Sequence, residues 1–228
     1  MVYVIATSRT WHENLPDVLQ SGSSDQFVLI NRKEDLTYEH MKDLHPRYIF
    51  FPHWSSIIPE EIYSNFECVI FHMTNLPFGR GGSPLQNLIV RGIYDTVISA
   101  LRCERGIDAG PIYMKKPLSL YGTAEEIFIR ASSVIRDMIR TIIKEQPQPV
   151  TQSGEVVVFE RRKPQDGNIE PLEDLNQIFD CIRMLDADGY PRAFLQTKHF
   201  HLEFQRASLK EGRIVSDVII TKKGGEHE

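Results

Sequence analysis

The segment from His72 to Pro84 holds the strongest concentration of residues that can do chemistry. It reads His-Met-Thr-Asn-Leu-Pro-Phe-Gly-Arg-Gly-Gly-Ser-Pro, so an imidazole is followed by a loop rich in glycine and proline. An imidazole titrates near neutral pH and can serve as a general base. Glycines allow a backbone to approach a ligand closely and leave N–H groups free to donate. The segment therefore predicts a ligand-binding loop beside a proton-accepting side chain.

Asp108 is the second group of interest. It lies in Gly-Ile-Asp-Ala-Gly, in a turn after the strand-like run Thr96 to Leu101. An aspartate brought to His72 by a neighbouring strand can fix the imidazole tautomer and stabilise its charge. Each residue also has a purely structural interpretation, because an aspartate between glycines is usually a turn residue. Taken alone, the residues indicate an α/β enzyme or binding protein with a His–Asp site.

Several other chemistries are disfavoured. The turn after the first apolar run reads Thr7-Ser-Arg-Thr-Trp11 and lacks the Gly-x-Gly-x-x-Gly pattern of dinucleotide sites, and a Walker A pattern is also missing. No His/Cys cluster has the spacing of metal ligands, so no metal site is expected. A Gly-x-Ser-x-Gly elbow is missing too, which argues against an ordinary serine hydrolase.

The elements that must position this site follow from hydrophobic patterning. Short, nearly continuous apolar runs are typical of strands covered on both faces. Segments of helical length separate them, among them Glu34 to Leu44, so we predict an α/β fold with a Rossmann-like, doubly wound, mostly parallel sheet. His72 would then lie at the carboxyl edge of the sheet, where such folds bind ligands. The predicted strands are Val2–Ala6, Phe27–Ile30, Tyr48–Phe51 and Cys68–Phe71.

The second half contains one long helix and a change of pattern. We expect the helix from about Ala124 to Lys144, beginning with a capping box between Thr123 and Glu126 and ended by Gln-Pro-Gln-Pro at 146–149. This predicts a catalytic domain over residues 1–147 and a small α+β appendage over 148–228, with a frayed tail at 224–228. The elements expected in the appendage are a helix at Asp174–Leu185 and strands at Val156–Phe159, Phe200–Phe204 and Ile214–Ile220.

Composition narrows the class of protein. The chain has 228 residues, and its 41% hydrophobic and 25% charged content is ordinary for a globular protein. A net charge of -5 weighs against a nucleic-acid partner, which usually needs a basic face. Three cysteines, odd in number and far apart, favour a reducing compartment. Neither a signal sequence nor a run of ~20 apolar residues is visible, so we expect a cytoplasmic protein without a membrane partner.

The two motifs together resemble the signature of the folate-dependent formyltransferases. In that family a His five residues before a Pro is followed by an Arg-Gly-x-x-Pro loop and later by an Asp-x-Gly turn. Here these positions are His72, Pro77, Arg80-Gly81 and Asp108. The resemblance covers the N-terminal two-thirds of the chain. The family includes methionyl-tRNA, glycinamide ribonucleotide and sugar N-formyltransferases.

Features of the appendage resemble the sugar branch. Arg161-Arg-x-Pro and Tyr190-Pro-x-Ala-Phe look like the region after the catalytic domain of enzymes that act on nucleotide-linked 4-amino-6-deoxy sugars, including the pseudaminic acid pathway enzyme. An equal alternative is that these residues serve packing and turns. The resemblance implies transfer of a formyl group from 10-formyltetrahydrofolate to the amine of a nucleotide-linked amino sugar. The acidic charge and the short C-terminal region agree with a small acceptor and not with tRNA.

The resemblance also implies roles for individual residues. His72 would accept the proton of the attacking amine and Asp108 would orient it. The family places an Asn two residues before the His, and here that position is Ile70, which cannot donate. Another group would then stabilise the developing oxyanion. The candidates are His53, Ser55, Thr74 and Asn75.

Expected substrate contacts and rival functions complete the hypothesis. Two rivals remain, namely a formyl-folate hydrolase and a non-catalytic module that binds folate or nucleotide-sugar. A homodimer is compatible with a small appendage that needs a partner surface. The residues expected to contact folate are Phe51, Trp54, Ile57, Arg80 and Gly81. The residues expected to contact the nucleotide-sugar are Arg9, Trp11, Arg80 and Tyr190.

Overall fold

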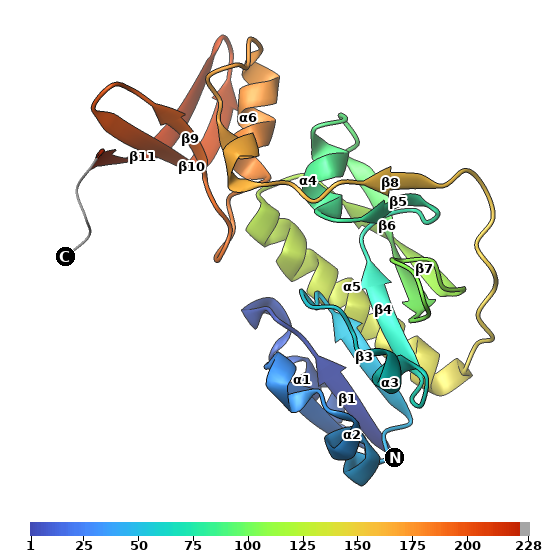
Figure 1. The fold of residues 1–228 in the computed structure, drawn as a ribbon. Helices are drawn as coiled ribbons and strands as arrows, with labels where there is room; N and C mark the ends of the chain where they lie inside the picture. The colour runs from blue at the N-terminus through green and yellow to red at the C-terminus, as the bar shows by residue number, and fades with distance from the viewer. Residues whose placement is uncertain (224–228) are drawn as a thin grey trace.

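A six-stranded sheet forms the centre of the protein in the computed structural model, which describes residues 1–223 (Figure 1). Its strand order is β2-β1-β3-β4-β6-β7, with the first four strands parallel and the last two antiparallel to their neighbours. The predicted α/β, Rossmann-like, mostly parallel sheet is therefore confirmed. The strands are β1 (Val2–Ala6), β2 (Gln26–Ile30), β3 (Tyr48–Pro52), β4 (Cys68–His72), β6 (Asp95–Arg102) and β7 (Ile112–Ser119).

Alternate residues of the central strands enter two separate hydrophobic cores. Phe50 packs in the larger core, which is covered by α1 (Leu15–Gln20) and α5 (Ala124–Glu145), whereas Phe51 packs in the smaller core under α2 (Tyr38–Leu44) and α3 (Glu60–Tyr63). Burial on both faces explains why these strands have nearly continuous apolar sequences.

Helix α5 begins as the sequence predicts. Thr123 accepts from the backbone N–H of Glu126, and the Glu126 carboxylate accepts from the backbone N–H of Thr123, which completes the capping box. Helix α2 begins four residues later than the predicted helical segment Glu34 to Leu44. Residues 33–35 form a 3₁₀ turn, and α2 starts at Tyr38 because the Thr37 hydroxyl caps it by accepting from His40 N–H.

The glycine-rich loop after His72 contains a short strand whose partner the sequence did not reveal. Strand β5 (Phe78–Gly81) runs parallel to β8 (Val157–Phe159), and Phe159 is buried in the larger core. We expected this segment to belong to the appendage, which is wrong for β8. Burial of the Phe159 ring in the larger core ties this segment to the loop after His72. The division into domains at residue 147 stays a prediction, because residues of the C-terminal region such as Ile182 and Met184 also belong to this core.

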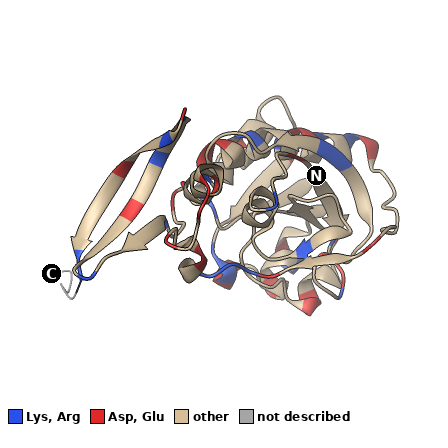
Figure 2. Ribbon diagram, turned by 90° about the horizontal axis from the view of Figure 1, so that it is seen from above, with Lys and Arg blue, Asp and Glu red and all other residues tan. Residues whose placement is uncertain are grey.

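The C-terminal region contains η3 (Pro164–Gly167), α6 (Leu175–Arg183) and a three-stranded antiparallel sheet of order β11-β10-β9. The hairpin of β10 (Phe200–Lys210) and β11 (Arg213–Lys222) extends away from the body, with β9 (Ala193–Gln196) beside β10 (Figure 2). The predicted helix and these two strands are thus present. The tail expected to fray lies outside the described residues. Within the described residues, no helix has the length and apolar character needed to cross a membrane.

Candidate active site

The structure brings the two predicted chemical groups together. His72 is the last residue of β4, and Asp108 lies in the loop between β6 and β7. Strand β6 is the neighbour of β4 but runs antiparallel to it, so the β6–β7 loop leaves the sheet at the amino end of β4, where Arg102 pairs with Val69. The loop then folds back and places the Asp108 Oδ2 atom 3.5 Å from His72 Nδ1. Both side chains are largely buried, with exposures of 8% and 12%. The site therefore holds a shielded imidazole–carboxylate pair at the carboxyl edge of the sheet.

Asp108 is held by the glycine-rich loop. Its Oδ2 atom accepts a hydrogen bond of 2.9 Å from the backbone N–H of Gly81, and its backbone has a left-handed φ of +49°. A non-glycine residue in this conformation costs on the order of 1–3 kcal/mol and persists only where its surroundings enforce it. The turn is thus shaped to present the carboxylate to His72 and Gly81.

The tautomer of His72 follows from its second contact. Its Nε2 atom lies 2.7 Å from the carbonyl oxygen of Gly79, and because a carbonyl can only accept, Nε2 carries a proton. The lone pair of the neutral ring is therefore on Nδ1, the atom that faces Asp108. A proton accepted at Nδ1 would be stabilised by the adjacent carboxylate. Gly79 has a φ of +79°, and a Cβ there would lie 2.8 Å from the Phe159 ring, so the position requires glycine.

Two of the four oxyanion candidates lie in the loop after His72, and the structure separates them. Thr74 is fully buried and its hydroxyl donates to Gly79 O at 3.3 Å, so this donor is already used inside the protein. Asn75 is exposed, and its Oδ1 atom accepts from Lys115 Nζ at 2.7 Å, which leaves the two amide N–H groups facing outward. Asn75 is the better candidate, and Lys115, which sequence reasoning missed, orients it. Ile70 has no group that could take this role.

His53 and Ser55 occupy a different environment. His53 Nε2 is 3.1 Å from the hydroxyl of Tyr190, in the C-terminal region. Ser55 is exposed, and its backbone N–H donates to Ser8 Oγ. Because its Nε2 is occupied by Tyr190, His53 is a structural link between the two parts of the chain and not a free oxyanion donor.

Three of the residues predicted to contact the nucleotide-sugar, Arg9, Trp11 and Tyr190, lie close together and contact one another. The Arg9 guanidinium lies 4.8 Å above the Tyr190 ring and 5.8 Å from that of Trp11. Trp11 in turn stacks on Phe128 of α5, with ring centroids 4.7 Å apart. This aromatic cluster packs the C-terminal region onto the body, which accounts for its residues without a nucleotide ligand. Arg80 lies elsewhere, in β5.

Two histidines beside this cluster, buried His12 and half-buried His53, are held neutral. Burial lowers the pKa of His12 to about 4, and burial, helped by His12 and Arg9, lowers the pKa of His53 to about 3. The unfolded chain binds protons at these positions below about pH 6.5, while the folded chain does not. Their contribution to stability is therefore present above that pH and is lost as the pH falls toward 4 and 3.

We accordingly expect the free energy of unfolding to decrease by about 2 kcal/mol per histidine between pH 6.5 and pH 5. Urea denaturation across this range measures the slope. His12→Leu removes one proton-binding site from the unfolded chain, so its slope should be shallower. The same substitution at exposed His199 serves as the control. An unchanged slope for His12→Leu would show that His12 is charged in the folded protein.

The residues expected to contact folate differ in accessibility. Phe51 is fully buried in the smaller core and cannot touch a ligand, so this prediction is wrong. Ile57 is 94% exposed, and the indole N–H of neighbouring Trp54 is buried with no partner among the described residues. Ile57 is therefore accessible to a ligand, whereas the indole N–H of Trp54 is not exposed to one in this structure. Arg80 and Gly81 line the loop beside Asp108.

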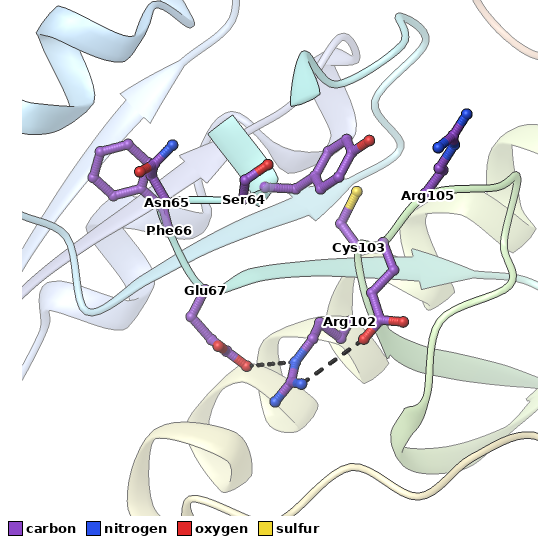
Figure 3. Close-up of a pocket in the computed structure, with 9 residues that line it drawn as sticks. Ser64, Asn65, Phe66, Glu67, Arg102, Cys103 and Arg105 are labelled. Atoms are coloured by element: carbon purple, nitrogen blue, oxygen red, sulfur yellow. Dashed lines mark hydrogen bonds and ion pairs between the residues drawn. The ribbon is translucent and has the colours of Figure 1, made fainter. Parts of the chain in front are cut away.

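A hollow of about 430 Å³ lies away from this pair (Figure 3). It is bordered by Glu67, just before β4, and by Arg102 at the end of antiparallel β6, so it opens at the amino edge of the parallel strands. Arg102 is neutralised there by Glu67 and Glu104. Glu67 and Arg102 lie at the opposite end of β4 from His72, so the hollow is separate from the imidazole–carboxylate pair.

Gln152 is a further residue that the sequence did not reveal. It lies in the irregular segment before β8, and its side chain contacts both Arg80 and the Asp108 turn. No motif marks it, because the contact depends on how residues 150–159 return to the catalytic loop. Only the pairing of β8 with β5 brings it there.

A Rossmann-like sheet that presents an imidazole–carboxylate pair under a glycine-rich loop defines an α/β enzyme that transfers protons during group transfer. The chain is 52% identical to a methionyl-tRNA formyltransferase from Clostridium thermocellum of known structure, with a TM-score of 0.95 over 97% of this chain and 99% of that one. Residues 164–221 match the family model described as methionyl-tRNA formyltransferase, C-terminal domain. The chain belongs to the formyltransferase family.

Two more distant relatives are also described as formyltransferases. The methionyl-tRNA formyltransferase of Thermodesulfovibrio yellowstonii is 25% identical over 199 residues, which cover 84% of this chain and 64% of that protein. The chain thus spans less than two thirds of that curated relative. A protein of Mycobacterium tuberculosis described as a likely sugar N-formyltransferase has the same fold, with a TM-score of 0.68 and 14% identity over 95% of both chains. The predicted family and its donor, 10-formyltetrahydrofolate, are confirmed.

The comparisons overturn the predicted acceptor. The similar proteins are methionyl-tRNA formyltransferases, while the sugar enzymes share little more than the fold. The assignments to a nucleotide-linked amino sugar and to the pseudaminic acid pathway are therefore wrong, and so is the exclusion of a nucleic-acid partner. The error has two physical sources. Net charge averages over the whole surface, and Tyr190 of the second short motif packs against Arg9 and Phe128 instead of marking a sugar site.

Proposed function

We propose that the protein transfers the formyl group of 10-formyltetrahydrofolate to the α-amine of methionyl-tRNA. The observation that carries the proposal is the 52% identity to the Clostridium thermocellum methionyl-tRNA formyltransferase along essentially the whole chain. The His72–Asp108 pair supplies the proton chemistry that such a reaction needs. The three cysteines are free and buried, which fits the reducing cytoplasm where aminoacyl-tRNA is found.

Different residues of the chain would carry out different parts of the reaction. The amine must lose a proton as it attacks, and His72 Nδ1 is the available lone pair, with Asp108 beside it as counter-ion. The outward amide of Asn75 is placed to donate to the oxygen on which charge develops. Trp54, Ile57 and the Arg80–Gly81 loop would hold the folate. When bound, 10-formyltetrahydrofolate supplies the activated formyl group.

The charge distribution supports an RNA acceptor despite the acidic total. Over residues 193–223, which contain the projecting hairpin, six basic side chains stand against three acidic ones. Figure 2 shows several of the basic residues along the hairpin. A local basic surface can neutralise phosphates even when the whole chain is negative. The basic residues are Lys198, Arg206, Lys210, Arg213, Lys222 and Lys223.

The direct test is formylation of methionyl-tRNA, followed by acid gel or mass, with 10-formyltetrahydrofolate as donor. Free methionine, uncharged tRNA and a reaction without acceptor are the comparisons. Formylmethionyl-tRNA that appears only with the charged tRNA supports the proposal. Release of formate at the same rate without acceptor would identify a hydrolase instead, and the proposal would be abandoned.

If the hairpin contacts phosphates, the double substitution Lys210→Ala and Arg213→Ala should raise KM for methionyl-tRNA and leave kcat unchanged. Each lost phosphate contact should also make the slope of log affinity against log salt shallower by about 1. Steady-state kinetics at several salt concentrations measure both effects. Lys144→Ala, at the exposed end of α5, is a control in the body of the protein. Equal salt slopes for the double variant and the wild type would exclude the hairpin as a phosphate-binding surface.

A further inference from the structure

Gln152 makes four hydrogen bonds with its side chain. The amide oxygen Oε1 accepts from Arg80 Nε at 3.1 Å and from Arg80 Nη2 at 2.7 Å. The amide nitrogen Nε2 donates to the backbone oxygens of Asp108 and Gly110, each at 2.8 Å. An amide has two acceptor lone pairs and two N–H donors, so the hydrogen-bonding capacity of Gln152 is fully used.

These bonds close a ring around the catalytic carboxylate. Arg80 precedes Gly81, whose backbone N–H donates to Asp108 Oδ2, and the Asp108 backbone oxygen returns to Gln152. The ring connects three segments that are far apart in sequence, namely β5, the β6–β7 loop and the segment before β8. Loss of Gln152 would free the guanidinium of Arg80 and two carbonyl oxygens of the Asp108 turn at once.

The Asp108 turn needs such support. Its left-handed backbone at φ +49° is held against an intrinsic preference for other conformations. On its other side the turn is confined by Gly110, where a Cβ would lie 2.0 Å from the backbone oxygen of Arg102. The backbone of Arg102 thus confines the turn at Gly110, and the side chain of Gln152 holds the same turn through the backbone oxygens of Asp108 and Gly110.

We propose that Gln152 is a positioning residue, which sets the distance and orientation of the Asp108 carboxylate relative to His72 by tying the Asp108 turn to Arg80. It touches neither of the two reacting side chains, so it acts through the backbone of the turn. The proposal concerns the geometry of the pair, and it rests on the proposed function only where formyl transfer is the readout.

Two substitutions test the idea. Gln152→Ala removes all four bonds. Gln152→Glu keeps the shape and the acceptors for Arg80, but it turns an oxygen toward the carbonyl oxygens of Asp108 and Gly110, where a donor is needed. Both should lower kcat by roughly 10- to 100-fold, because a displacement on the order of 1 Å at a reacting group can have an effect of this size. KM for the folate donor should stay within about twofold in Gln152→Glu, which keeps the contact with Arg80, and should rise in Gln152→Ala, which loses it. Gln148→Glu, at an exposed glutamine in the same segment, should match the wild type.

A second readout needs no substrate. The imidazole ¹⁵N signals of His72, assigned with His72→Gln, report the hydrogen bonds at Nδ1 and Nε2. We expect both signals to shift in Gln152→Ala and Gln152→Glu and to stay in place in Gln148→Glu. If methionyl-tRNA is not the acceptor, the wild type will be inactive in the formylation assay while the NMR shifts persist, so the two proposals fail separately.

The inference is overturned if the His72 nitrogen signals are unchanged in folded Gln152→Glu. It is also overturned if kcat of Gln152→Glu is unchanged while its KM for the donor rises, because this variant keeps the contact with Arg80 and the effect would then lie in substrate binding. A lower Tm with an unchanged kcat at a temperature where the variant is folded would leave Gln152 a purely structural role and would equally exclude the proposal.

Discussion

Replacing His72 by Gln lowers kcat for formyl transfer by about 10²- to 10⁴-fold, the range typical of a lost general base. Glutamine can still donate to the Gly79 carbonyl through its amide, so the loop contact can be retained. What is lost is the lone pair that Nδ1 presents beside Asp108. The proton of the attacking amine then has no acceptor with a nearby counter-charge. Single-turnover rates with saturating donor and acceptor isolate this step.

Asp108→Asn separates the two members of the pair. The amide still accepts from Gly81 N–H through its oxygen, but it no longer carries a charge to stabilise a proton on His72. We expect a decrease in kcat of the same order, and the double variant should be little worse than either single variant, because residues that act as a unit are not additive. His201→Gln, on the remote C-terminal sheet, is the control. Independent, multiplicative losses would show that His72 and Asp108 do not work together.

Replacing Arg183 by Met destabilises the protein by about 3–5 kcal/mol, the range found when one partner of a buried ion pair is removed. Arg183 is 3% exposed and lies at the end of α6, where its Nε donates to Asp180 at 2.7 Å. Its Nη1 atom also donates to the backbone oxygens of Leu120 and Gly122, on the loop before α5. Methionine fills part of the space, but it leaves these acceptors and a buried carboxylate unpaired.

Denaturant unfolding of Arg183→Met, followed by far-ultraviolet circular dichroism, gives the loss in the free energy of unfolding. Arg136→Met removes an exposed pair with Asp137 and should change stability by less than about 1 kcal/mol. The double variant Asp180→Leu with Arg183→Met should regain part of the loss, since it removes the unpaired buried charge. A destabilisation of Arg183→Met no greater than that of Arg136→Met would refute a central role for this pair in holding α6 against the body.

The sequence alone was sufficient for the features that depend on local pattern. The apolar runs predict the four parallel strands, because strands buried on both faces, such as β1, β3 and β4, need hydrophobic residues at nearly every position. Strand β2 has an apolar sequence too, although it lies at the edge of the sheet and is only partly buried. Thr123 and Glu126 mark the first turn of α5, because capping depends on residues three apart. His72 and Asp108 were identified through the resemblance of their motifs to the formyltransferase signature, whereas the antiparallel course of β6 and the return of its loop to His72 were not predicted.

Tertiary structure decided what depends on contacts between distant segments. The pairing of β8 with β5 brings Gln152 to the Asp108 turn, and neither the residue pattern nor the spacing predicts that the chain returns there. The packing of the folded chain buries Phe51 in the core, and it brings His53 within hydrogen-bond distance of the Tyr190 hydroxyl. The predicted acceptor was wrong for a different reason. A net charge is a single sum, and it hides six basic residues that the sequence already gathers between residues 198 and 223. Only the folded chain shows that most of them lie on a hairpin that projects from the body, because that depends on the pairing of β10 with β11 (Figure 2).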